Sequence, residues 1–154
     1  MAACAGWRRA VMSWVMGRLG VGLVCAVLAA GPAVVLPQDR PQCRVTGVTD
    51  GDTLRLTCAG VVHKVRLLGY DTPEIFHPGC PAEKAAGERA TERLRVFVAS
   101  GPVTAVRFQG RDRYGRDLAQ VEIGGRDVAA FMLGSPLALP YAGKRHPDWC
   151  ALLP

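Results

Sequence analysis

The segment VRLLGYDTPE, from Val65 to Glu74, is the stretch on which both the fold and the candidate chemistry depend. Its first half has the apolar β-type residues of a strand, with one basic residue, Arg66, among them. Pro73 fixes its own φ angle and pushes the residue before it into an extended conformation. The segment therefore predicts a strand that ends in a stiff turn, on which Asp71 and Glu74 are held apart.

The N-terminus differs in composition from the rest of the chain. Three arginines precede an uncharged run over residues 19–36, and no acidic residue occurs before Asp39. A basic segment, an apolar segment and small residues near its end are the features of a secretory signal peptide. We expect residues 1–33 to be such a signal and residues 34–41 to be a linker. An uncleaved membrane anchor is the alternative, because the uncharged run is just long enough to span a bilayer.

Without its N-terminal segment the chain has about 120 residues, enough for one small hydrophobic core. The full sequence of 154 residues has 19 basic and 13 acidic side chains, and three of the basic ones lie in the expected signal. The remaining excess of positive charge is mild. It permits a polyanionic partner such as nucleic acid without requiring one.

Four cysteines follow the N-terminal segment, and an even number in a small exported chain favours disulfides. A zinc site is the less favoured alternative, because the sequence has no CxxC pair. The Asp-Gly pair at residues 50–51 lies between two β-type runs and predicts a hairpin, which places Cys43 opposite Cys58 if neither strand contains a bulge. We therefore predict the disulfides Cys43–Cys58 and Cys80–Cys150.

The remaining pattern predicts an α+β domain that is mainly β. Runs of β-branched and alternating apolar residues indicate strands, and the segment after Pro81 has the apolar stripe of a helix. The predicted strands are residues 43–49, 52–58, 61–68, 103–109 and 116–123, and the predicted helices are residues 82–99 and 127–133. This order indicates a five-stranded OB-fold barrel with two helices, over residues 42–140, followed by a short tail at 141–154.

Three groups of polar residues meet if the strands curl into a barrel. They lie at the hairpin turn (Asp50, Asp52), on the opening segment (Arg66, Asp71, Thr72, Glu74) and around Tyr114-Gly115 (Arg113, Arg116). Carboxylate and carbonyl oxygens suit a hard divalent cation, two guanidinium groups can hold a phosphate, and a further carboxylate can take a proton from water. Together these groups are what metal-assisted phosphodiester hydrolysis requires. Each motif alone is common in turns, so spacing by itself leaves the site open.

Four motifs resemble those of the thermonuclease family, the staphylococcal-nuclease-like nucleases. They are DGDT at residues 50–53, VRLLGYDTPE at 65–74, His77-Pro78, and DRYGR at 112–116, and they occur in the family's order. The match runs over about residues 43–139, most of the chain after the N-terminal segment. The resemblance implies an OB barrel with helices and an enzyme that cleaves DNA and RNA to leave 3′-phosphates. Because the chain stops soon after Cys150, we expect the family's third helix to be missing.

The resemblance also implies a role for each candidate residue. The carboxylates of Asp52 and Asp71 and the carbonyl of Thr72 are implied to ligate Ca²⁺, and Glu74 is implied to be the general base. Arg66 and Arg116 are implied to bind the scissile phosphate. Arg113 and Tyr114 are implied to contact a neighbouring phosphate. Another divalent cation is an alternative to Ca²⁺. Outside these motifs, Tyr141 is interpreted either as a base-stacking or as a partly buried residue, Trp149 as a core residue, and the three histidines as surface residues.

These features predict an exported enzyme, periplasmic or secreted, that acts as a monomer on DNA and RNA and has no protein partner. The rival interpretation is a non-catalytic OB-fold module that binds nucleic acid. Such modules stack bases on aromatic side chains, and only 6% of this chain is aromatic. The chain also has all of the carboxylates (Asp52, Asp71, Glu74) and both of the arginines (Arg66, Arg116) that the enzyme would need, which favours the enzyme.

Overall fold

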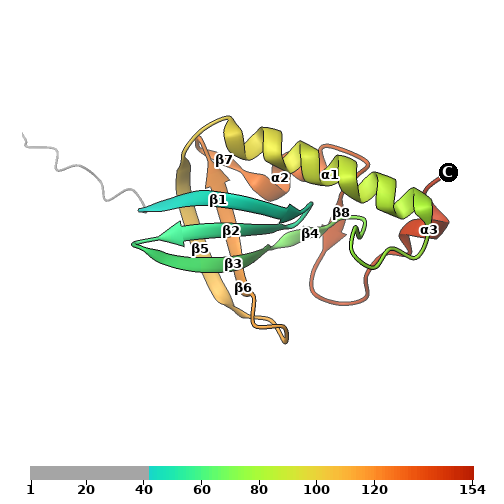
Figure 1. The fold of residues 1–154 in the computed structure, drawn as a ribbon, viewed down its shortest axis with the longest axis horizontal. Coiled ribbons are helices and arrows are strands. Elements are labelled where there is room, and N and C mark those ends of the chain that lie inside the picture. The colour runs from blue at the N-terminus through green and yellow to red at the C-terminus, as the bar shows by residue number, and fades with distance from the viewer. Residues whose placement is uncertain (1–41) are drawn as a thin grey trace, which may run out of the picture. The chain divides into compact units, whose positions relative to one another are not determined.

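The computed structural model describes residues 42–154 (Figure 1). The expected signal peptide and the expected linker at 34–41 lie outside the described residues. Among the helices of residues 42–154, none combines the length and the apolar composition that a membrane span needs.

A six-stranded sheet forms the body of the domain. Its strands are β1 (Cys43–Asp50), β2 (Thr53–Cys58), β3 (Val61–Leu67), β5 (Val103–Arg111), β6 (Asp117–Ile123) and β7 (Arg126–Asp127). They follow the order β1-β2-β3-β6-β5, with β7 added to β6. All neighbours are antiparallel except β3 and β6, which run parallel. The predicted α+β, mainly β class is confirmed, and the arrangement is consistent with an OB-type fold. Within the described residues, no hydrogen-bonded pairing closes β1 onto β5.

Three helices and a small second sheet complete the fold. The helices are α1 (Pro81–Ala99), α2 (Val128–Leu133) and α3 (Trp149–Leu152), and the second sheet pairs β4 (Gly69–Asp71) with β8 (Leu139–Tyr141). Figure 1 shows α3 beside the first turn of α1, far along the chain from it. The expectation of only two helices is therefore wrong. The third forms because the side chain of Asp148 caps it by accepting a hydrogen bond from the N–H of Ala151.

The core lies between α1 and the curled sheet. Alternating residues of β2 and β3 point into it, and α1 contributes one stripe of small and large apolar side chains. The fully buried members from these elements are Leu54, Leu56, Val65, Ala90 and Leu94. Each large aliphatic side chain contributes about 1.5–3 kcal/mol when it is buried rather than exposed. The same face of α1 also lies against the turns that carry the polar residues.

Two glycines allow α1 to lie against the turns that carry the polar residues. A Cβ atom on Gly51 would lie 2.6 Å from the hydroxyl of Thr72 and 2.9 Å from the Cβ of Ala90. A Cβ atom on Gly87 would lie 2.6 Å from the carbonyl oxygen of Pro73. Because these distances are too short for real side chains, only glycine permits the close approach. The helix therefore fixes the hairpin turn and the segment after Pro73.

The hairpin of β1 and β2 confirms the predicted disulfide Cys43–Cys58. Near the turn, however, its register differs from the prediction. Asp50 pairs with Thr53, so the turn residues are 51 and 52, one position later than predicted. Two register shifts between β1 and β2 offset this difference and bring the cysteines opposite each other.

Candidate active site

A buried ion-pair cluster lies where the hairpin turn, β3 and β4 meet. The guanidinium of Arg66, on β3, donates to Oδ2 of Asp52 at 2.7 Å and to Oδ1 of Asp71 at 2.9 Å. The three residues are only 9% (Asp52), 6% (Arg66) and 4% (Asp71) exposed. The structure therefore brings together both predicted carboxylates and one predicted arginine, which come from three different elements.

Neighbouring hydroxyl and amide groups complete the surroundings of Asp52. Thr53 donates its hydroxyl to Oδ1 at 3.0 Å, and Thr72 donates its hydroxyl to Oδ2 at 3.4 Å. The N–H of Asp52 donates to the carboxylate of Asp50 at 3.1 Å. Buried polar groups need such partners, because an unpaired one costs its full desolvation energy. The turn is also fixed by Tyr70, whose buried hydroxyl donates to the carbonyl of Gly51 at 3.0 Å.

The cluster has more negative than positive charge. Burial raises the pKa of Asp52 to about 7, the guanidinium of Arg66 opposes this rise, and the carboxylates of Asp50 and Asp71 add to it. The carboxylates of Asp52 and Asp71 thus share one buried guanidinium, and the carboxylate of Asp50 lies close enough to raise the pKa of Asp52 further. Their oxygens are the donors that a hard divalent cation prefers, and a second cation would compensate their charge. The donor set and its charge fit such an ion.

The C-terminal tail supplies two further partners of Asp71. The indole N–H of Trp149 donates to Oδ2 at 3.1 Å, and Nδ1 of His146 lies 2.9 Å from Oδ1. Trp149 is buried, as its interpretation as a core residue requires. The interpretation of His146 as an ordinary surface residue missed its contact with Asp71. No local pattern indicates a contact between residues 75 positions apart.

Arg116 joins the cluster from the corner between β5 and β6. Its Nη1 donates to the hydroxyl of Thr53 at 3.2 Å, and that hydroxyl donates in turn to Asp52. Asp112 orients Arg116 by accepting a hydrogen bond from its Nε at 2.7 Å. The same carboxylate accepts the backbone N–H groups of Tyr114 and Arg116 at 2.8 and 3.0 Å. The turn thus directs Arg116 toward the predicted metal ligands.

Arg113 and Tyr114 lie at the edge of the site, on the exposed part of the same corner. Nη2 of Arg113 donates to the hydroxyl of Tyr114 at 2.6 Å, and the guanidinium of Arg116 lies 5.6 Å from the centre of the tyrosine ring. Both arginines border a second cleft of ≈ 630 Å³, which they share with Arg66 and Tyr141. Tyr141 is half-buried and stacks on His146, with 4.7 Å between the ring centres.

Glu74 is exposed and lies on the segment between β4 and α1. Its Oε1 accepts the backbone N–H groups of Ile75 and Phe76, each at 2.8 Å. It borders a cleft of ≈ 500 Å³ together with the cluster and with Arg116. All predicted site residues except Arg113 line this cleft. It therefore combines the oxygens of the predicted cation ligands, two guanidinium groups and one exposed carboxylate.

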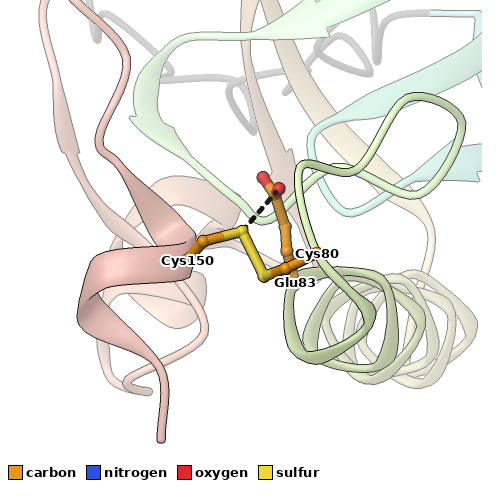
Figure 2. A group of neighbouring side chains, drawn as sticks. All are labelled: Cys80, Glu83 and Cys150. Atoms are coloured by element: carbon orange, nitrogen blue, oxygen red, sulfur yellow. Dashed lines mark hydrogen bonds between the residues drawn. A yellow bond between two sulfur atoms is a disulfide. The ribbon is translucent and has the colours of Figure 1, made fainter.

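Figure 2 shows the group formed by Cys80, Glu83 and Cys150 at the junction of α1 and α3. The predicted disulfide Cys80–Cys150 is confirmed, and an oxygen of Glu83 lies 3.6 Å from the sulfur of Cys150. These ligand atoms lie close enough together to hold a metal ion. The two sulfurs are bonded to each other, however, and are not the thiolates that a metal requires. The group therefore ties the tail to the start of α1.

Comparison with known proteins found a family model and several relatives that match this chain. The family model described as "Staphylococcal nuclease homologue" matches residues 64–148. The SPbeta prophage-derived endonuclease YokF of Bacillus subtilis is 40% identical over 91 residues, which cover 58% of this chain and 30% of that protein. Endonuclease YncB of the same organism is 35% identical over 109 residues, which cover 66% of this chain and 51% of the relative. The thermonuclease of Staphylococcus hyicus is 33% identical over 81 residues, 53% of this chain and 48% of that enzyme.

The matched segment of this chain spans about a third to a half of these three relatives. The family model covers more than half of the chain and includes most of the cleft, from Lys64 on β3 to the residue before Trp149. The chain therefore belongs to the family of staphylococcal nuclease homologues.

Proposed function

We propose that this protein is a divalent-cation-dependent nuclease that hydrolyses phosphodiester bonds in DNA and RNA. One observation carries the proposal. The buried ion-pair cluster, Arg116 and Glu74 border a single cleft, although they come from four separate parts of the chain. A cleft with paired carboxylates, two guanidinium groups and an exposed carboxylate suits a phosphodiester and an attacking water.

The cation would be held by the carboxylates of Asp52 and Asp71 and by the backbone carbonyl of Thr72. Ca²⁺ suits these oxygens, and another divalent cation is the alternative. When bound, the ion polarises a phosphoryl oxygen and offsets the charge that develops on it.

Arg66 and Arg116 would bind the phosphate whose ester bond is cleaved. Within the described part of the chain, the hydrogen bonds of Arg116 use Nε and Nη1, so Nη2 remains for a phosphate oxygen. Arg66 is held in place by two carboxylates and by the carbonyl of Leu67, so its remaining N–H groups have a fixed direction. Donors fixed in advance stabilise the charge of the transition state without reorganisation.

Glu74 would act as the general base. It takes a proton from a water molecule while the water oxygen forms a bond to phosphorus. The bond from phosphorus to the 5′-oxygen breaks, and that oxygen leaves with a proton from solvent. The products are a 3′-phosphate and a 5′-hydroxyl end. This assignment is supported by the exposure of Glu74 to the cleft that the two guanidinium groups also border.

The substitution Glu74→Gln tests this function. We expect it to lower the cleavage rate by about 10²–10⁴-fold, because the amide cannot accept the proton. Glu88→Gln is the matched control, since Glu88 is an exposed carboxylate on α1 whose ion pair with Lys84 is 3.8 Å long. Purified wild type, E74Q and E88Q are incubated with single-stranded DNA and with RNA, with Ca²⁺ or with chelator, and the product ends are mapped.

Wild-type cleavage that needs the cation and leaves 3′-phosphates supports the proposal. Binding of nucleic acid without any cleavage by the wild type would overturn it in favour of a non-catalytic binding module. Cleavage by E74Q at the wild-type rate would remove Glu74 as the base.

We also propose that the protein is exported. The two disulfides support this location, since they persist in oxidising compartments. The first residue of the mature protein, measured by N-terminal sequencing, distinguishes a cleaved signal at residues 1–33 from an uncleaved anchor. The tail at 141–154 would belong to the nuclease domain, because it contributes His146 and Trp149 to the surroundings of Asp71.

A further inference from the structure

Glu83, in the first turn of α1, bonds to both ends of the segment that carries Glu74. Its Oε1 accepts the N–H of Glu74 at 3.3 Å, and its Oε2 accepts the N–H of Gly79 at 2.6 Å. One carboxylate therefore spans residues 74–79, which contain no regular secondary structure.

We propose that Glu83 is a positioning residue for Glu74, an inference that rests on the proposed function. The carboxylate of Glu74 accepts the N–H groups of Ile75 and Phe76, so the direction of that carboxylate depends on the backbone of residues 74–76. The N–H of Glu74 donates the hydrogen bond that ties this part of the backbone to Glu83 of α1. Loss of that bond frees the backbone and, with it, the catalytic carboxylate.

The neighbouring turn of α1 supports the same segment. Gly87 lies four residues after Glu83, on the same side of the helix. Its Cα is so close to the segment that an added Cβ would lie 2.6 Å from the carbonyl oxygen of Pro73 and 3.2 Å from the carbonyl carbon of Glu74. The helix thus contacts the backbone on both sides of Glu74, by packing at Gly87 and by hydrogen bonds at Glu83.

The start of α1 suits a charged acceptor at this position. A carboxylate in the first turn is stabilised by the positive end of the helix dipole. The disulfide between Cys80 and Cys150 holds this end of the helix against α3, as Figure 2 shows. The helix end and the disulfide therefore hold Glu83 in place, so that it can orient the segment that carries Glu74.

The contacts of Glu83 also separate positioning from catalysis. Glu83 borders the cleft, but both of its oxygens accept backbone N–H groups of the segment, which assigns the carboxylate to holding that segment. Glutamine keeps the shape of the side chain but has one accepting oxygen instead of two, and alanine has none. The series Glu, Gln, Ala therefore removes the two bonds stepwise.

The test compares wild type, E83Q, E83A, the matched control E88Q, and the double variant E74Q/E83Q. With single-stranded DNA and Ca²⁺, we expect kcat to fall about tenfold in E83Q and further in E83A, because small displacements of a catalytic group are costly. KM should stay within twofold, since the phosphate-binding arginines are unchanged, and E88Q should match the wild type. In the E74Q background, E83Q should cause no further loss, because Glu83 acts through Glu74.

Equal kcat in E83Q and E88Q would overturn the proposal. So would a kcat of E74Q/E83Q that lies below that of E74Q by the factor that E83Q causes in the wild type. Hydrogen exchange at the amides of Glu74 and Gly79 gives a second measurement that needs no activity. Both amides should exchange faster in E83A than in E88Q, and unchanged protection would overturn the proposal. Should the wild type cleave nothing, the proposed function fails, and the exchange measurement still decides whether Glu83 anchors the segment.

Discussion

The two halves of the candidate site are built in different ways. The ion-pair cluster of Asp52, Arg66 and Asp71 is buried at the ends of strands, and each member is bonded to residues distant in the sequence. Glu74 is exposed, and within residues 42–154 its carboxylate accepts hydrogen bonds from the next two residues alone. The backbone N–H of Glu74 donates to one side chain of α1. The half proposed to bind the cation is therefore part of the folded core, whereas the half proposed to take the proton is attached to it locally.

This difference predicts that substitutions in the two halves of the site have different effects on stability and on activity. Removal of one partner from a buried ion pair leaves an uncompensated charge in a poorly solvated place. Removal of an exposed carboxylate leaves no such charge. Substitutions in the cluster should therefore impair both folding and cleavage, while those at Glu74 or Glu83 should impair cleavage alone.

The largest effect on stability is expected for Arg66→Met, which keeps most of the side-chain volume and removes the charge. The carboxylates of Asp52 and Asp71 then lose their shared partner, and we expect the free energy of unfolding to fall by about 3–5 kcal/mol. Urea denaturation measures this change, and a cleavage assay on the fraction that remains folded should show no activity.

Arg107→Met is the matched control for this substitution. Arg107 pairs with Glu122 at 2.9 Å, but its side chain is 59% exposed, and exposed pairs contribute less than about 1 kcal/mol. Equal stability of the two variants would show that the cluster does not belong to the folded core and would remove the contrast between the two halves.

The buried half of the site was the easier one to predict from the sequence. Strand patterns and turn residues place Asp52, Arg66 and Asp71 at the ends of neighbouring elements, because side-chain direction follows the alternation of a strand. The sequence also predicts the disulfide of the hairpin correctly, but it does not predict the register of β1 and β2 near the turn. Two shifts between β1 and β2 move the turn by one position, and a single sequence gives no signal for them.

Distant partners of both halves could not be predicted from the sequence. Glu83 is an ordinary acidic residue in the first turn of a helix until its distance from the N–H of Glu74 is known. His146 and Trp149 reach Asp71 from more than 70 residues away, in a tail with little periodicity. The sequence indicates which groups have catalytic chemistry, whereas long-range packing decides which groups orient them.

The two disulfides provide an intermediate test of the contrast, because one closes the hairpin and the other holds the tail to α1. Their sequence separations are 15 residues for Cys43–Cys58 and 70 for Cys80–Cys150. The chain-entropy relation then gives contributions of about 3 and about 4 kcal/mol, so C80S/C150S should be less stable than C43S/C58S by about 1 kcal/mol. Urea denaturation of both double variants measures this difference.

Only the second disulfide should affect cleavage. Its removal frees α3 and the start of α1, and thus the residues that contact Asp71 and the segment after Pro73. Cleavage under conditions where both variants are folded should fall in C80S/C150S and stay near the wild-type rate in C43S/C58S. Equal rates would show that the tail does not help to hold the site.

The smallest effect is expected for Asp112→Asn, at the partly exposed corner that orients Arg116. Burial opposes ionisation of Asp112, but hydrogen bonds from the side chain and backbone of Arg116 and from the backbone of Tyr114 lower its pKa below the ordinary value of 3.8. Because the folded pKa is below the unfolded one, the carboxylate stabilises the protein fully above the unfolded value. This stabilisation is lost as the pH falls through the lowered pKa.

The wild type should therefore exceed D112N in free energy of unfolding at neutral pH by less than about 1 kcal/mol, and this difference should disappear in acid. Urea denaturation at neutral pH and below the ordinary carboxyl pKa measures it. A gap that does not change with pH would mean that the substitution acts through the geometry of the turn, and that charge does not hold Arg116 at this corner.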